Sequence, residues 1–171
     1  MRHLRLLFIS ILVLFLVWLG ISLLIPSHIR ISRAIDIFST RQRVYEQISD
    51  LRRWDGWNQF TANSGLSNMR FSGPSSGSGA WLQSDQLKIR INNSNTDSVS
   101  SFWEQKHGKS FSGGFNIMEL RTGTITVQWY FDFYLKWEPW EKFSSIVYDK
   151  QLGPVMEESL IKLKTLTESN P

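Results

Sequence analysis

Three side chains of the sequence have the chemistry that general acid–base catalysis needs, namely His107, Glu119 and Asp132. His107 lies in a polar run, residues 105–109, which is typical of a solvent-facing turn. Glu119 shares the strand parity of Phe115 and Ile117, which leaves two interpretations: an inward side chain that could act as a base, or a solvated side chain near the end of the strand. Asp132 shares the parity of Tyr130 and is predicted to point outward. None of the three has an evident catalytic partner, so the sequence favours a non-enzymatic protein and no catalytic residue is assigned.

Other reactive patterns are missing from the sequence. The chain has no cysteine, which excludes disulfides, thiolate metal sites and cysteine nucleophiles. It also has no H-E-x-x-H motif, no G-x-S-x-G elbow and no phosphate-binding glycine loop. We therefore expect neither a metal nor a cofactor.

Tryptophan is the residue type that stands out. The chain has eight tryptophans, and seven of them follow residue 25. Such side chains suit the wall of an apolar cavity because they offer broad rigid surfaces, although they can equally fill a solid core. Trp137 and Trp140 flank Glu138 and Pro139 just before the last predicted helix. They are expected either to cover a cavity or to lie against lipid headgroups.

An apolar segment without charge, residues 6–25, contains Trp18 and precedes the other seven tryptophans. At about 1.5 Å per residue a helix of this length spans roughly 30 Å, the thickness of a bilayer's hydrocarbon core. A cleaved signal peptide and a buried soluble helix are the alternatives. The apolar part of a signal peptide is usually about 7–15 residues long and ends in small residues, whereas Leu23, Leu24, Ile25 and Pro26 follow here. The segment is therefore interpreted as an uncleaved transmembrane anchor.

The basic residues on either side of the apolar segment indicate how it is oriented in the membrane. Arg2, His3 and Arg5 precede the segment, and Arg30 and Arg33 follow it. The positive-inside rule then favours a single-pass protein of the cell membrane with its N-terminus in the cytoplasm and its domain outside.

The part of the chain that follows the apolar segment has the size of one domain. The chain is therefore divided into an anchor, residues 1–28, and a domain, residues 29–171. After residue 25 there are seventeen Lys and Arg against fifteen Asp and Glu, a net charge of +2. No basic cluster is present, so nucleic acid is not an expected partner. Oligomeric state is left open.

The first part of the domain reads as a strand followed by short helices. Isoleucine at alternate positions predicts a strand over residues 29–38. Ser39 or Thr40 can cap the helix that follows, and a second short helical piece is expected over residues 51–57.

The second part reads as a meander of antiparallel strands closed by a long helix. Polar loops separate the apolar runs, which is typical of such a meander. The predicted strands cover residues 80–83, 86–91, 99–104, 111–120 and 124–134. Leucine and methionine at steps of three or four predict a helix over residues 144–168. Pro154 is expected either to kink this helix or to mark the start of its regular part.

Three stretches of the domain carry a family resemblance. Residues 32–60 combine the first strand, the capped helix and an aspartate followed by two tryptophans three positions apart. A glycine-rich turn leads to Gly79, Ala80 and Trp81, and residues 148–166 read YDKQLGPVMEESLIKLKTL. Together they resemble the START-like, or helix-grip, superfamily (SRPBCC), in its polyketide cyclase/dehydrase and lipid-transport branch.

One departure from the family pattern lies near Gly123 and Thr124. The family places its Gly-Thr pair one residue nearer to the motif that Val127 and Trp129 match, which indicates a bulge or a slipped register. The face that Trp129 occupies therefore stays open.

The resemblance implies an α+β helix-grip fold, in which a curved antiparallel sheet wraps around the long C-terminal helix and encloses an elongated cavity. Superfamily members bind sterols, phospholipids, polyketides and aromatic ligands there, and some are enzymes. We therefore expect a membrane-anchored module that binds a hydrophobic small molecule or lipid. The alternatives are a cyclase- or dehydratase-type enzyme and a non-catalytic interaction protein with a closed cavity. The candidate cavity residues are Trp54, Trp57, Phe71, Trp81, Trp103, Phe115, Trp129, Phe131, Met156 and Leu160.

Overall fold

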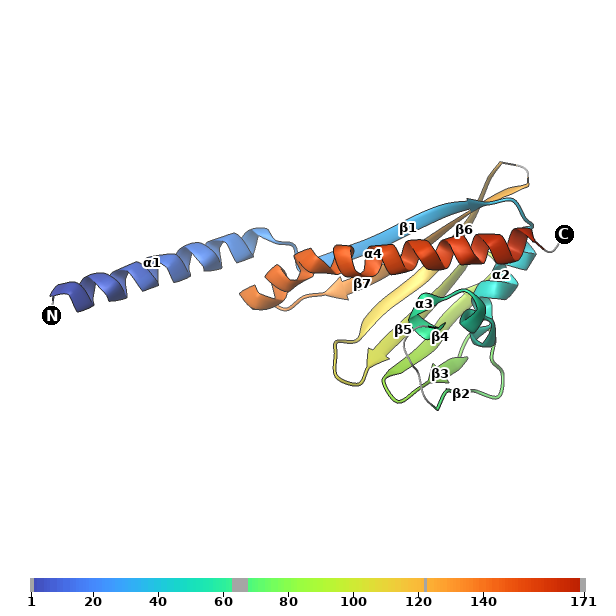
Figure 1. Cartoon of the computed structure of the whole chain (residues 1–171), viewed down its shortest axis with the longest axis horizontal. Helices are drawn as coiled ribbons and strands as arrows, with labels where there is room; N and C mark the ends of the chain where they lie inside the picture. Colours follow the sequence, from blue (N-terminus) through green and yellow to red (C-terminus); the bar gives the residue numbers. More distant parts are fainter. Residues whose placement is uncertain (1, 63–67, 122, 170–171) are drawn as a thin grey trace.

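The protein has a long N-terminal helix followed by a seven-stranded sheet and a long C-terminal helix (Figure 1). The structure is a computed structural model and describes residues 2–62, 68–121 and 123–169. Helix α1 (Arg2–Leu24) projects away from the sheet. In the part of the chain that the structure describes, it is the one helix long and apolar enough to cross a membrane.

All neighbouring strands of the sheet are antiparallel, and their order is β1-β7-β6-β5-β4-β3-β2. The first strand therefore lies beside the last, and the others follow as a meander. The strands are β1 (His28–Ile37), β2 (Arg70–Phe71), β3 (Trp81–Gln83), β4 (Leu87–Asn95), β5 (Ser98–Gln105), β6 (Phe111–Arg121) and β7 (Thr124–Tyr134). This arrangement confirms the predicted α+β fold with a curved antiparallel sheet and a C-terminal helix.

The bulge expected near Gly123 is present in the ladder between β6 and β7. Its register shifts between Glu119 and Arg121, opposite Ile125 and Thr124. Trp129, four residues further along β7 than Ile125, is fully buried against the core, which settles its face.

Short helices connect β1 to β2. Helix α2 (Arg41–Ser49) begins after Thr40, whose hydroxyl accepts the N–H of Arg43, as expected for an N-cap. A 3-10 helix, η1 (Leu51–Gly56), follows directly, and a four-residue helix, α3 (Gln59–Ala62), which the sequence pattern did not predict, completes the connection.

Helix α4 (Pro139–Glu168) begins five residues before the predicted start at residue 144. Pro139 is tolerated in its first turn because the first N–H groups of a helix have no partner within the helix. Pro154 lies inside the helix, which continues through it in both directions. The apolar stripe of α4 packs along β1 and over the core, with Met156, Leu160 and Leu163 fully buried.

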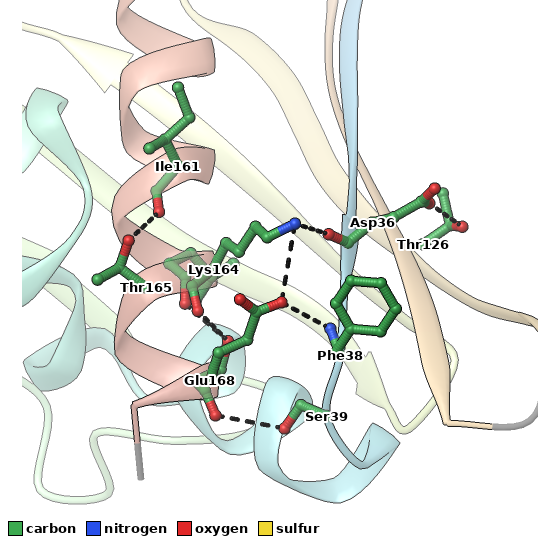
Figure 2. Close-up of polar contacts among 10 residues, drawn as sticks. Asp36, Phe38, Ser39, Thr126, Ile161, Lys164, Thr165 and Glu168 are labelled. Atoms are coloured by element: carbon green, nitrogen blue, oxygen red, sulfur yellow. Dashed lines mark hydrogen bonds and ion pairs between the residues drawn. The ribbon is translucent and has the colours of Figure 1, made fainter.

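The C-terminal end of α4 is fixed to the end of β1 by polar contacts (Figure 2). The Glu168 carboxylate accepts the backbone N–H of Phe38 at 2.8 Å. The Lys164 ammonium donates to the carbonyl of Asp36 at 2.8 Å and lies 3.7 Å from Glu168. The hydroxyl of Ser39 donates to the carbonyl of Thr167 at 3.5 Å. These contacts between α4, the end of β1 and Ser39 close the end of the sheet that is far from α1.

Candidate functional site

The aromatic side chains predicted to line a cavity form a continuous packed cluster. Trp54 stacks on Trp103 with ring centroids 5.8 Å apart, and Trp57 meets Phe115 and Trp129 edge-on at 5.8 and 6.0 Å. The buried indole N–H groups of Trp54 and Trp103 donate to the Ile48 carbonyl and to the Ser101 hydroxyl, respectively. Eight of the ten candidates are fully buried: Trp54, Trp57, Trp103, Phe115, Trp129, Phe131, Met156 and Leu160. Phe71 and Trp81, on β2 and β3, are half-buried.

Two adjoining hollows lie at one end of this cluster, and we call them together the β5–β6 cleft. They share Gln105, His107, Gly108, Phe111 and Leu152 as lining residues. The first, of about 340 Å³, also contacts Phe60, Gln86, Leu87 and Trp103. The second, of about 520 Å³, extends along α4 to Lys109, Phe133, Tyr148 and Gln151. Each is within the size range of pockets for small molecules, which begins at about 300 Å³.

The strand register shows which end of the sheet carries the cleft. Leu87 pairs with Gln105, and Trp103 pairs with Phe111, so the lining residues of β4, β5 and β6 lie level with one another. Phe133 of β7 pairs with Ile29 at the start of β1. The cleft therefore opens at the end of the sheet where α1 joins β1, opposite the end that Lys164 and Glu168 close.

Trp103 alone among the ten candidates lines the cleft. The other apolar lining residues were missed, although the sequence carries a signal for them. Phe111 and Phe133 have the inward parity of Phe115 and Phe131, and Leu152 precedes Met156 by one helical turn. Periodicity identifies the inward face, but it does not say at which end of a strand that face is left uncovered.

Phe60, in the unpredicted helix α3, separates the cleft from the packed cluster. Its ring meets Trp103, Trp129 and Phe131 at centroid distances of 5.9, 5.6 and 5.7 Å. It also lines the first hollow. The floor of the cleft is therefore aromatic, with Phe60 supported from behind by the core.

The titratable candidates occupy three different surroundings. His107 is exposed in the turn between β5 and β6 and lines both hollows. Glu119 occupies the second of the two positions expected for it, near a strand end and in solvent: its side chain is 43% exposed and lies 3.9 Å from Arg41. Glu119 pairs with Ile125 in regular register, and the shift comes only after it, so Glu119 keeps its strand parity. It is exposed because it lies past Ile117, the last buried residue of β6.

Asp132 lies on the outer face of β7, as predicted, but basic groups cover it. Its carboxylate accepts two hydrogen bonds from the Arg30 guanidinium, at 2.8 and 2.7 Å, and lies 3.1 Å from the His28 ring. The bonds from Arg30 hold the pKa of Asp132 below its ordinary value against the opposing effect of burial, and His28 adds to this. The group therefore ties β1 to β7 and does not face the cleft.

The rim of the cleft is polar and partly fixed. Lys109, which lines the second hollow, forms an ion pair of 2.7 Å with Glu141 in the first turn of α4. Glu141 also accepts the backbone N–H of Lys136 at 3.0 Å, and these two contacts lower its pKa. Within the described residues, no group of three or more His, Asp and Glu side chains is placed to hold a metal ion. The arrangement suits an apolar body against the floor and a hydrogen-bonding group at the rim.

No protein-family model and no curated protein matches the sequence. Solved structures do resemble the fold. DynU16, a protein in the dynemicin biosynthetic locus, is 15% identical, with a TM-score of 0.58 over 83% of this chain and 48% of its own. A START superfamily protein from Mycobacterium smegmatis is 14% identical, with a TM-score of 0.57 over 83% of this chain and 99% of its own. The chain has the helix-grip fold.

A plant enzyme has the same architecture. Truncated norcoclaurine synthase from Thalictrum flavum is 8% identical, with a TM-score of 0.56 over 81% of this chain and 92% of its own. The chain spans only 48% of DynU16 and 66% of CalU16 from Micromonospora echinospora, the first two similar structures. At these identities the likeness concerns the helix-grip fold alone, so function has to be argued from the cleft.

Proposed function

We propose that this helix-grip protein binds an apolar small molecule or lipid in the β5–β6 cleft, with α1 anchoring it in a membrane. The observation that carries the proposal is the cleft itself, whose hollows of about 340 and 520 Å³ have aromatic and aliphatic walls. Apolar pockets of this size with a few polar groups at the rim are typical of ligand sites. The helix-grip fold supports the same reading, because similar structures include START superfamily proteins.

The walls and rim of the cleft define the ligand's chemistry. Trp103, Phe111 and Leu152 offer only hydrocarbon and ring surface, which favours an acyl chain or a fused apolar ring system. The side-chain amides of Gln105 and Gln151 and the ring of His107 can each hydrogen-bond a hydroxyl, carbonyl or carboxyl group. An amphipathic molecule with one polar end fits both requirements.

The candidate residues behind the cleft have a supporting role in this proposal. Trp54, Trp57 and Trp129 pack against one another and against Phe115. They hold Phe60 and Trp103 in place. The ligand contacts Phe60 and Trp103, whereas Trp54, Trp57 and Trp129 support these two rings from behind. Binding deeper among them would require these rings to separate.

The membrane part of the proposal assigns residues 1–28 to an anchor and residues 29–171 to the binding domain. Helix α1 supports it, because its apolar side chains are exposed along almost its whole length. Arg2 and Arg5 at its start favour a cytoplasmic N-terminus and a domain outside the cell membrane.

Photolabelling tests both parts at once. The full-length protein is reconstituted in phosphatidylcholine vesicles with a diazirine-bearing fatty acid, irradiated, and mapped by mass spectrometry. We expect labelling of residues 103–111 and around Leu152, and separately of α1. Leu152→Gln should reduce the cleft label several-fold because it places a polar amide in both hollows. Ile161→Gln, on the same helix but 57% exposed, is the matched control and should leave the label unchanged.

The two regions report on different claims. Equal cleft labelling in the wild type and in Leu152→Gln would contradict the binding site. Absence of label from α1 would contradict the anchor, whatever happens in the cleft. Label in α1 without label in the cleft would leave a membrane protein whose domain binds no fatty acid.

A further inference from the structure

The first turns of α4 extend past the end of the sheet and lie beside the last turns of α1 (Figure 1). The ring of Trp18 stacks on that of Phe143, with centroids 5.9 Å apart and planes 3° from parallel. The ammonium group of Lys142 donates to the carbonyl of Ile25 at 2.9 Å, immediately after α1 ends. Both contacts hold the start of α4 against the apolar helix.

The depth of this contact along α1 follows from helix geometry. Trp18 precedes Leu24, the last residue of α1, by six residues, which correspond to about 9 Å along the axis. Ser22, between them, is fully buried, and a small side chain at such a position allows close helix packing. If α1 spans a bilayer, the ring of Phe143 is therefore below the level at which α1 leaves it.

The surrounding surface has the composition of a membrane interface. Tyr134, Trp137 and Trp140 are 73%, 70% and 62% exposed. The other domain tryptophans, all within the described residues, are buried or half-buried, so the exposed pair is confined to this one segment. Tryptophan and tyrosine are favoured at the headgroup level of a bilayer because one side of the ring is apolar and the other can hydrogen-bond.

We propose that residues 134–143 are embedded in the headgroup layer and form a second membrane contact beside α1. The inference rests on the proposed anchor. The charges in the segment are compatible with it: Lys142 bonds the Ile25 carbonyl, Glu141 is paired with Lys109, and exposed Lys136 can reach lipid phosphates. Glu138 is half-buried within the protein.

The second contact brings the cleft to the lipid. Glu141 belongs to the embedded turn, and its partner Lys109 lines the second hollow. The mouth of the cleft therefore lies within one side-chain length of the headgroup layer. An apolar ligand can then pass from the leaflet into the cleft without crossing water.

The absence of cysteine from the natural chain makes this measurable. Nitroxide labels are attached to three single-cysteine variants of the full chain in phosphatidylcholine vesicles: Val13→Cys within α1, Lys136→Cys, and Lys162→Cys. Lys136 is exposed, and Lys162 is an exposed lysine on the far half of α4, with 48% of its side chain accessible. For each label, the collision rate of the nitroxide with oxygen, which is enriched in lipid, is compared with its collision rate with a nickel complex dissolved in water.

We expect position 13 to be shielded from nickel, position 162 to be fully accessible, and position 136 to be several-fold less accessible than 162. In the Lys136→Cys background, the exchange of Trp137 and Trp140 for serine should raise the nickel accessibility at position 136 toward that at 162. Equal accessibility at 136 and 162 with position 13 shielded would overturn the inference and leave the anchor standing. An aqueous signal at position 13 would overturn both. No response to the serine pair would show that the aromatic rings do not hold the segment.

Discussion

The guanidinium group of Arg33, on β1, lies against the Cα of Gly153 in the middle of α4. Any Cβ at position 153 would overlap Nη2 and Cζ of Arg33. Around this crossing point Arg33 bonds Glu157 at 2.6 Å and Asp149 at 3.0 Å, each one turn of α4 away from Gly153. The glycine therefore lets a single arginine bind two carboxylates of one helix and join that helix to the edge of the sheet.

Gly153→Ala should be close to neutral for stability in the wild type, although alanine is worth about 1 kcal/mol more than glycine inside a helix. The new Cβ displaces the guanidinium and so weakens its bonds to Glu157 and Asp149. In an Arg33→Ala background nothing is displaced, and the full gain of about 1 kcal/mol should appear. Thermal unfolding of the four proteins in detergent measures the coupling. Equal stabilisation in both backgrounds would show that Arg33 and Gly153 are independent.

The Asp132 carboxylate should make stability depend on acid. Its pKa is lowered in the folded state by Arg30 and His28, relative to about 3.9 in an unfolded chain. A lowered pKa contributes stability that is fully present above about pH 4 and is lost as the pH falls through the folded value. Asp132→Asn should therefore destabilise by about 1 kcal/mol near pH 7, and this deficit should shrink progressively as the pH falls below about 4. Urea unfolding across this range provides the measurement.

The matched control for acid dependence is Asp55→Asn, at an exposed aspartate of η1. Its unfolding curve should follow the wild type at every pH. If Asp132→Asn also follows the wild type, the Arg30–Asp132 pair contributes nothing net to stability. Arg30 is half exposed, with 51% of its side chain accessible, so solvent screening is the reason the expected effect is small.

Much of the fold could be predicted from local patterns. The alternation of Ile29, Ile31, Ile35 and Ile37 predicts β1 to within one residue at each end. An apolar residue at every second position is typical of a strand with one buried face. Helix α3 was missed because four residues are too few to show helical periodicity. The start of α4 was placed late because no capping side chain marks it: the residue before Pro139 is Glu138, whose side chain makes no cap hydrogen bond.

The candidate site was harder to predict than the fold. Trp54 and Trp103 both have the inward position that the sequence implied. Trp54 lies within the packed cluster, whereas Trp103 also lines the cleft. Whether an inward ring meets another ring or an open space depends on the three-dimensional fit of distant segments, such as Phe60 against Trp129. Glu119 illustrates a different problem, because it keeps the strand parity of Ile117 yet lies past the buried part of β6, where alternation no longer indicates burial.

Trp57 and Trp137 should respond oppositely to the same truncation. Trp57 is 1% exposed and contacts Phe115 and Trp129, so Trp57→Ala should cost about 3–5 kcal/mol or prevent folding. Trp137 is 70% exposed, and Trp137→Ala should change the free energy of unfolding by less than about 0.5 kcal/mol. Circular dichroism of both variants in detergent distinguishes them. A large loss at Trp137 would mean that its ring packs against the protein and is not held for lipid.

Glu141 and Glu168 close the two ends of α4 and should be separable by amide hydrogen exchange. Glu141 accepts the N–H of Lys136 and pairs with Lys109, whereas Glu168 accepts the N–H of Phe38. Glu141→Ala should speed exchange at Lys136 and in residues 106–110 by about threefold to tenfold, the effect of losing a hydrogen bond worth about 1 kcal/mol. Glu168→Ala should do the same at Phe38 alone. Only Glu141→Ala releases the rim of the β5–β6 cleft, so this variant should also speed release of a bound fatty acid. Equal release rates in both variants would mean that the Lys109–Glu141 pair does not hold the mouth of the cleft closed.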